Sequence, residues 1–111
     1  MLLNGGTYNG KRFLSRPNTQ LLTVSNQTGS LFGGENGDMH FSLGFRVVTE
    51  KGERLGMGSA GKFAWGGYFN TNYFADPKEG IVAVLMKQTQ SLSSDTSENV
   101  FIRMIYQSLD D

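Results

Sequence analysis

The feature that most constrains the fold is an uninterrupted apolar run in the second half of the chain. Every residue from Ile81 to Met86 is apolar, and the run follows a turn-forming stretch from Asp76 to Gly80. A strand with one buried face alternates apolar and polar residues, so a continuously apolar strand is expected to be buried on both faces. The run is far shorter than the ~20 residues that a helix needs to cross a bilayer. The sequence therefore predicts a strand that lies between two layers.

The residues before this run predict the other strands of an antiparallel sheet. The segment 41–49 alternates and places four apolar residues on one face: Phe41, Leu43, Phe45 and Val47. A hairpin turn at 50–53 is expected to lead into a short strand near 54–57. An aromatic strand, Gly67 to Ala75, then precedes the turn and the apolar run. The result is an antiparallel meander.

Helices are predicted near both ends of the chain. Met1 to Leu3, stopped by Gly5, is typical of the end of a helix. Ser15 is a suitable N-cap for a short helix over Asn18 to Val24, with Pro17 in its first turn. At the other end, apolar residues recur at helical spacing after a polar linker at 91–96: Val100, Phe101, Met104, Ile105 and Leu109. Asp95 and Glu98 suit a capped start for that helix.

These elements predict an α+β fold, with an antiparallel sheet of three or four strands and the C-terminal helix on one face. Residues 1–111 form a single partial domain. Its parts are a helix tail, turn, short helix and loop at 1–38, the meander at 39–90 and the C-terminal helix at 95–109. That helix covers one face of the sheet, and the helix after Ser15 is too short to cover the other. We therefore expect a second copy, or something outside this chain, to do so.

Composition excludes several classes of partner. The ten basic and ten acidic residues give a formal net charge of zero, and Lys11-Arg12 is the only adjacent basic pair. We therefore expect neither nucleic acid nor an anionic membrane as a partner. With no cysteine and one histidine, His40, no disulfide, metal site or cofactor is expected. The sequence carries no signal peptide, so the chain as written is expected to be soluble and cytoplasmic, whereas a longer parent protein could be periplasmic.

Several local motifs have structural explanations. Gly56 to Gly61 matches the dinucleotide fingerprint by letter, but the residues after it predict a strand where that fingerprint needs a helix. Ser59 and Lys62 have the Ser-x-x-Lys spacing of penicillin-binding enzymes, yet three glycines nearby argue against the helix that this chemistry needs. The Tyr-x-Asn spacing of Tyr68 and Asn70 is equally local. We interpret both spacings as coincidences.

Three further residue groups also have structural explanations. His40 has no serine or acid at an interpretable spacing, so a surface or strand-edge position is expected rather than a general base. Asp76 and Glu79 are explained by turn chemistry. The aromatic residues between 63 and 74 could stack on single-stranded nucleic acid, but core packing is the simpler explanation for a neutral chain.

The segment from Gly61 to Pro77 closely resembles the third-motif region of the serine β-lactamase-like family. The shared pattern is Trp65-Gly66-Gly67, then Thr71, an aromatic strand, Asp76-Pro77 and an apolar strand. The flanking segments 3–15 and 43–47 also resemble that family, so the resemblance covers nearly the whole chain. The family includes class C β-lactamases, penicillin-binding proteins, esterases and acyltransferases.

The resemblance implies acyl transfer through a serine ester. Many members carry Lys-Thr-Gly at the third motif, and esterase-type members often carry Trp-x-Gly, which Trp65-Gly66-Gly67 matches. It also implies that the N–H just after Gly67, that of Tyr68, would be an oxyanion-hole donor. Trp65 would line the acyl pocket, and Gly66 and Gly67 would let the substrate approach the backbone. A small ester or amide would be the substrate of the parent enzyme.

The resemblance also implies that the nucleophile is missing from this chain. The family's Ser-x-x-Lys lies well upstream of the third motif, and no counterpart precedes Leu2. We therefore expect no catalytic residue in this chain, which would form one wall of the site and be inactive alone. It would act with the missing N-terminal portion of the parent, or as a homo-oligomer. Two alternatives remain: a non-enzymatic fragment that self-associates or docks to a partner, and a small-ligand binder that uses the aromatic strand.

Overall fold

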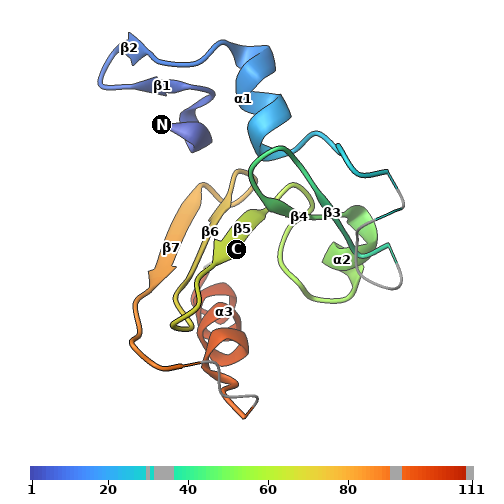
Figure 1. Cartoon of the computed structure of the whole chain (residues 1–111), viewed down its shortest axis with the longest axis vertical. Coiled ribbons are helices and arrows are strands. Elements are labelled where there is room, and N and C mark those ends of the chain that lie inside the picture. The colour runs from blue at the N-terminus through green and yellow to red at the C-terminus, as the bar shows by residue number, and fades with distance from the viewer. Residues whose placement is uncertain (30, 32–36, 91–93, 110–111) are drawn as a thin grey trace.

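The computed structural model describes residues 1–29, 31, 37–90 and 94–109 of the chain (Figure 1). These residues form the following helices and strands, in chain order: a 3₁₀ turn η1 (Leu2–Asn4), β1 (Thr7–Tyr8), β2 (Lys11–Arg12), α1 (Arg16–Thr23), β3 (Met39–Phe41), β4 (Arg46–Val48), α2 (Glu50–Arg54), β5 (Phe63–Gly66), β6 (Asn72–Asp76), β7 (Ile81–Leu85) and α3 (Ser97–Gln107).

The main sheet has five antiparallel strands in the order β3-β4-β5-β6-β7, and β1 pairs with β2 in a separate hairpin. Helix α3 packs against one face of the main sheet, where the rings of Phe74 and Tyr106 stack with centroids 6.0 Å apart. The predicted α+β class and the C-terminal helix are therefore confirmed. The predicted count of three or four strands is too low, because the main sheet has five.

The extra strand arises because the predicted strand at 41–49 is interrupted by a turn. The Ser42 hydroxyl accepts hydrogen bonds from the N–H groups of Gly44 (3.3 Å) and Phe45 (3.0 Å) and donates one to the Leu22 carbonyl (2.6 Å). These bonds reverse the chain between β3 and β4. Leu43 consequently lies at the exposed tip of the turn, 66% accessible, rather than on the apolar face that the alternation predicted.

The prediction of a turn and a strand at 50–57 is also wrong, because this segment begins with helix α2. Thr49 caps the helix: its hydroxyl accepts a hydrogen bond from the Gly52 N–H at 3.2 Å. Gly52 is required there, since a Cβ would lie 2.3 Å from the Asp38 carbonyl oxygen. Capping by threonine, followed by an acidic residue at position 50, was the signal that the sequence offered.

The helices predicted near the two ends of the chain are present as α1 and α3, with a side-chain cap at the N-cap residue of α1 and none at the N-cap residue of α3, Thr96. Ser15 caps α1 through its hydroxyl, which accepts a hydrogen bond from the Asn18 N–H at 3.3 Å. Gly5 ends η1 in the left-handed conformation, with φ 63°. Asp95 accepts a hydrogen bond from the Ser97 N–H at 3.0 Å, where α3 begins. None of the helices in the described ranges combines the length and the apolar character needed to pass through a lipid bilayer.

The second face of the sheet is covered only in part. A core of Val47, Phe63 and Ala75 is covered there by partly buried apolar residues, among which Leu2 and Val24 come from the N-terminal segment. Beyond this core, five large side chains of the same face are exposed: Trp65, Tyr73, Val82, Val84 and Met86. Val82 is 64% and Val84 57% accessible. From the sequence we expect that this chain alone does not bury both faces of β7, and the exposure of Val82 and Val84 agrees with this.

Asp76, at the end of β6, is completely buried and still fully hydrogen-bonded. It accepts bonds from the Tyr106 hydroxyl (2.5 Å) and from the N–H groups of Ser59 (3.2 Å), Lys78 (3.1 Å) and Glu79 (3.3 Å). Burial by itself would raise the pKa of Asp76, but the hydrogen bonds from Tyr106 and Ser59 outweigh burial and hold this pKa below its usual value. The charged carboxylate therefore joins α3 to two turns of the sheet.

Tyr106→Phe removes one donor from this buried carboxylate and should lower the free energy of unfolding by roughly 1–3 kcal/mol at pH 7. Because folding lowers the pKa of Asp76, the stabilisation is present above the unfolded pKa of about 4 and is lost as the pH falls through the folded pKa. Urea unfolding at pH 7 and at pH 3 measures both effects. Tyr8→Phe, at an exposed tyrosine, is the matched control and should change little. An equal loss in both variants would contradict this role of Tyr106.

Candidate functional site

The candidate site lies where β4 stops alongside β5. The two strands pair only through Arg46 with Ala64 and Val47 with Phe63, whereas β5 continues to pair with β6 as far as Gly66. The last residues of β5 therefore have a strand neighbour on one side only. A pocket of about 410 Å³ lies there, and all four residues that the sequence predicted as one wall line it: Trp65, Gly66, Gly67 and Tyr68.

These residues run into a tight turn between β5 and β6, so the predicted strand from Gly67 to Ala75 is wrong in its first half. The Asn70 N–H donates to the Gly67 carbonyl at 3.0 Å, and the Gly67 N–H donates to the Thr71 carbonyl at 2.9 Å. Asn70 adopts the left-handed conformation, with φ 60°. A β-turn followed by a left-handed residue is a common hairpin connection, and asparagine tolerates that conformation better than most residues.

The backbone donor of Tyr68 is unused in this turn. Tyr68 is the second residue of the β-turn, and the N–H of that position takes no part in the turn's own hydrogen bond. In the described part of the chain, the Tyr68 N–H donates no hydrogen bond. A side chain at position 67 would be disfavoured, since a Cβ there would lie 2.5 Å from the Thr71 hydroxyl oxygen. With glycine at this position, the backbone beside Tyr68 is not covered by a side chain. An unused N–H beside bare backbone is what an oxyanion hole requires.

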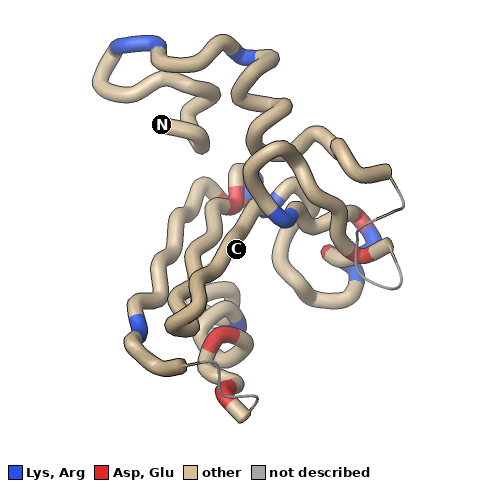
Figure 2. The backbone as a smooth tube through the Cα atoms, viewed as in Figure 1, with Lys and Arg blue, Asp and Glu red and all other residues tan. Residues whose placement is uncertain are grey.

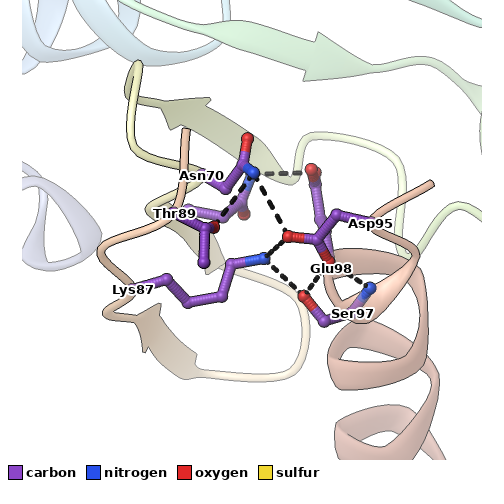
Figure 3. Close-up of polar contacts among 7 residues, drawn as sticks. Asn70, Lys87, Thr89, Asp95, Ser97 and Glu98 are labelled. Carbon is purple, nitrogen blue, oxygen red and sulfur yellow. Dashed lines mark hydrogen bonds and ion pairs between the residues drawn. The ribbon is translucent and has the colours of Figure 1, made fainter. Parts of the chain in front are cut away.

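A polar network ties this turn to the start of α3 (Figure 3). The Asn70 side-chain amide donates to the Thr89 hydroxyl at 3.1 Å and to the Asp95 carboxylate at 3.2 Å. Lys87 forms an ion pair with the same carboxylate, and both side chains are less than one-fifth exposed. The wall at Gly67 and Tyr68 is therefore held by residues from the segment that follows β7.

Ser97 and Lys87 lie within hydrogen-bond distance in this network, which raises the question of a nucleophile and its base. The Lys87 amine donates to the Ser97 hydroxyl at 2.5 Å, and that hydroxyl donates to Asp95 at 2.6 Å. Hydrogen bonds from Lys87 and Ser97 hold the pKa of Asp95 far below its usual value, so Asp95 is a poor base. Lys87, as an ion-paired ammonium, has no lone pair with which to accept a proton. The pair therefore anchors α3 and is not arranged for catalysis.

Ser59 and Lys62, which have the Ser-x-x-Lys spacing, lie outside this pocket in the turn before β5. The Ser59 hydroxyl donates to Glu79 at 3.1 Å, whereas the Lys62 amine donates to the Met57 carbonyl. Both residues are buried. Burial lowers the pKa of Lys62 to about 8, and its amine lies 4.9 Å from the centre of the Phe74 ring. Because the hydroxyl and the amine have different partners, they do not form a nucleophile–base pair.

The remaining sequence candidates occupy structural positions. His40 lies on the edge strand β3, as expected, with Nε2 at 2.8 Å from the Val24 carbonyl oxygen. The glycine-rich stretch before β5 leads into a strand, so no helix N-terminus faces a nucleotide phosphate there. The core-packing explanation of the aromatic residues holds for Phe63 and Phe74, which are buried. It is wrong for the four exposed ones: Trp65, Tyr68, Phe69 and Tyr73.

Charged residues of the pocket were missed at the sequence level. Four charged side chains line it: Arg46, Lys87, Asp95 and Glu98. Asp95 and Glu98 were assigned only to the start of α3, and nothing local marked Arg46 or Lys87. No cluster of three or more acidic residues and histidines that could hold a metal occurs among residues 1–29, 31, 37–90 and 94–109.

Comparison with known proteins adds no relative to this picture. The chain matches no protein-family model, and no curated protein matches it significantly. The site is therefore interpreted from its own geometry and from the third-motif resemblance.

Asn70 offers a test of the turn that carries the Tyr68 N–H. Asn70→Gly accepts the left-handed conformation and loses only the side-chain bonds to Thr89 and Asp95. Asn70→Ala loses the same two bonds and is also strained in the left-handed conformation. We expect Asn70→Ala to be the less stable of the two by roughly 1 kcal/mol in urea unfolding. Faster exchange of the backbone amides at positions 67 and 70 in both variants would show that loss of the side-chain bonds loosens the turn. Equal stability of the two variants would show that the backbone conformation at Asn70 is not a constraint.

Proposed function

We propose that this chain forms one wall of the active site of a serine hydrolase of the β-lactamase-like type. The reaction is hydrolysis of an ester or amide through an acyl-serine. The chain supplies the oxyanion-hole donor and the lining of the acyl pocket, and another polypeptide segment supplies the serine. On this proposal, the described residues alone are inactive.

The observation that carries the proposal is the pocket at the end of β5. The four wall residues implied by the resemblance line one pocket, and the Tyr68 N–H at its rim is unused among the described residues. A donor fixed in this way needs no rearrangement when negative charge develops on the carbonyl oxygen. Trp65-Gly66-Gly67 matches the esterase form of the third motif, which favours an ester over a β-lactam.

The place of the missing serine follows from the exposed surfaces. The two serine–lysine pairs of the described residues, Ser59 with Lys62 and Ser97 with Lys87, make hydrogen bonds that stabilise the fold. The open side of the sheet, formed by Trp65, Tyr73, Val82, Val84 and Met86, adjoins the pocket because Trp65 belongs to both. A segment packed on that face would bring a nucleophile close to Tyr68. It would also cover the second side of β7.

Tyr68→Pro and Tyr68→Phe separate the backbone donor from the side chain. Proline is favoured at the second position of a β-turn, so Tyr68→Pro removes the N–H with little effect on the turn. We expect it to lower kcat by about 10²–10³-fold, as loss of an oxyanion donor does, whereas Tyr68→Phe should stay within a few-fold of wild type. The measurement is hydrolysis of p-nitrophenyl esters by the assembled protein, recovered through a tag on this chain.

Two outcomes of this assay would overturn the proposal. One is an assembled protein that hydrolyses neither esters nor amides. The other is hydrolysis by the purified chain alone that disappears with Ser59→Ala or Ser97→Ala, because the nucleophile would then lie within the described residues.

The alternative function is a non-enzymatic module that self-associates or docks to a partner. The exposed side chains of β7 favour it, because contiguous apolar surface beside aromatic residues is typical of an interaction site. The same surface serves the hydrolase proposal, so only the catalytic assay separates the two.

Sedimentation tests whether this face is an interface at all. We expect the pure chain to sediment as a dimer or larger species, and Val84→Lys to shift it toward monomer, because a charge would be buried in the contact. Lys51→Arg, on α2, is a neutral control. A wild-type chain that stays monomeric at high concentration would count against self-association.

A further inference from the structure

The charges that line the pocket neutralise one another. Arg46 lies 3.5 Å from Glu98, and Lys87 forms an ion pair with Asp95. Both cations that line the pocket are thus already matched by a carboxylate. A substrate carboxylate entering the pocket would have to compete with Glu98 for Arg46 or with Asp95 for Lys87.

Asn72 makes the pocket still less favourable for an anion. Its side chain is only 4% exposed and donates from Nδ2 to Glu98 at 2.8 Å. Its Oδ1 is buried and has no hydrogen-bond partner among the described residues. Because this oxygen is buried, it offers no acceptor to a ligand, but its partial negative charge adds to the cost of placing a second negative group in the pocket.

The rest of the lining suits a flat apolar group. The rings of Phe41 and Trp65 lie edge to face with centroids 5.8 Å apart, and Tyr68 lies at the rim. Gly66 and Gly67 add no side chain between these rings and the substrate. An aromatic ring can therefore pack against Trp65 while the atom beside it approaches the Tyr68 N–H.

We propose that this pocket selects esters whose acyl group is an uncharged aromatic ring and discriminates against substrates that carry a carboxylate beside the scissile bond. The selection follows from two internal ion pairs, the partial negative charge of the buried Asn72 oxygen and an aromatic wall. It rests on the proposed function for the identity of the reaction, but the choice between neutral and anionic ligands belongs to the pocket itself.

Trp65 provides a direct reporter, because it is the only tryptophan in the chain and lines the pocket. The experiment titrates the purified chain with methyl benzoate and with benzoate, which share a ring and differ in charge. We expect methyl benzoate to change the Trp65 emission saturably, with an affinity at least about fivefold higher than that of benzoate, a difference of about 1 kcal/mol. Equal affinities, tighter benzoate binding or no saturable change with either ligand would overturn the inference.

Glu98→Gln tests the electrostatic cause. The glutamine can still accept from Asn72, but it leaves Arg46 without its carboxylate. Benzoate should then bind roughly two- to fivefold more tightly than it binds to wild type, and its affinity should change by more than that of methyl benzoate. Glu50→Gln, on α2 and outside the pocket lining, makes the same charge change and should alter neither ligand. An unchanged benzoate affinity in Glu98→Gln would show that Glu98 does not set the preference.

Failure of this inference and failure of the proposed function give different results. If the neutral ester binds as described but the assembled protein hydrolyses no ester or amide, the proposed function is wrong and the pocket's selectivity stands. If the assembled protein hydrolyses neutral esters and their carboxylate-bearing analogues at equal rates, the function stands and the inferred selectivity is wrong.

Discussion

The structure depends first on the buried carboxylate of Asp76. A carboxylate without access to water stays ionised only when donors surround it, and here they come from the turn before β5, the turn between β6 and β7 and helix α3. Of these donors, only Tyr106 comes from α3. By fixing that helix against the sheet, the carboxylate helps to fix where α3 begins. Asp95 and Glu98 consequently lie beside the end of β5 and complete the pocket lining.

The pocket itself is a product of strand lengths. Strand β4 is three residues long, so β5 extends past it and its last residues have strand pairing on one side only. The turn after β5 contains Gly67 and, in the left-handed conformation, Asn70, and the Tyr68 N–H between them is unused. Elsewhere among the described residues, basic and acidic side chains are interspersed from residue 38 onward, whereas the N-terminal hairpin and the start of α1 carry only the basic residues Lys11, Arg12 and Arg16 (Figure 2).

Partner binding and catalysis are linked in the proposed function. The exposed face formed by Trp65, Tyr73, Val82, Val84 and Met86 shares Trp65 with the pocket. A segment that buried this face would remove water from the pocket and strengthen the interaction between the Tyr68 N–H and a developing oxyanion. It would also weaken solvent screening of the Arg46–Glu98 pair, and so sharpen the preference for uncharged ligands.

The sequence by itself determined the features that depend on neighbours in the chain. It predicted the strand of β7 from its apolar run, helix α1 from its serine cap, helix α3 from its periodicity and the turn at 76–80 from its residue types. The resemblance at Trp-Gly-Gly also singled out four residues that line one pocket, and their part in a reaction is a proposal.

Only the tertiary structure decided what depends on contacts between distant segments. Ser42 turns the chain because its hydroxyl reaches Leu22, and no local pattern shows that contact. The packing of α3 on the sheet brings Glu98 to Arg46, and the buried carboxylate of Asp76 accepts a hydrogen bond from Tyr106, thirty residues further along. Alternation predicts which face a residue occupies, but it does not show where a strand stops or what covers the face. For that reason the sequence implied two buried faces for β7, whereas in the folded chain Ile81, Ala83 and Leu85 are half-buried on one face and Val82 and Val84 are exposed on the other.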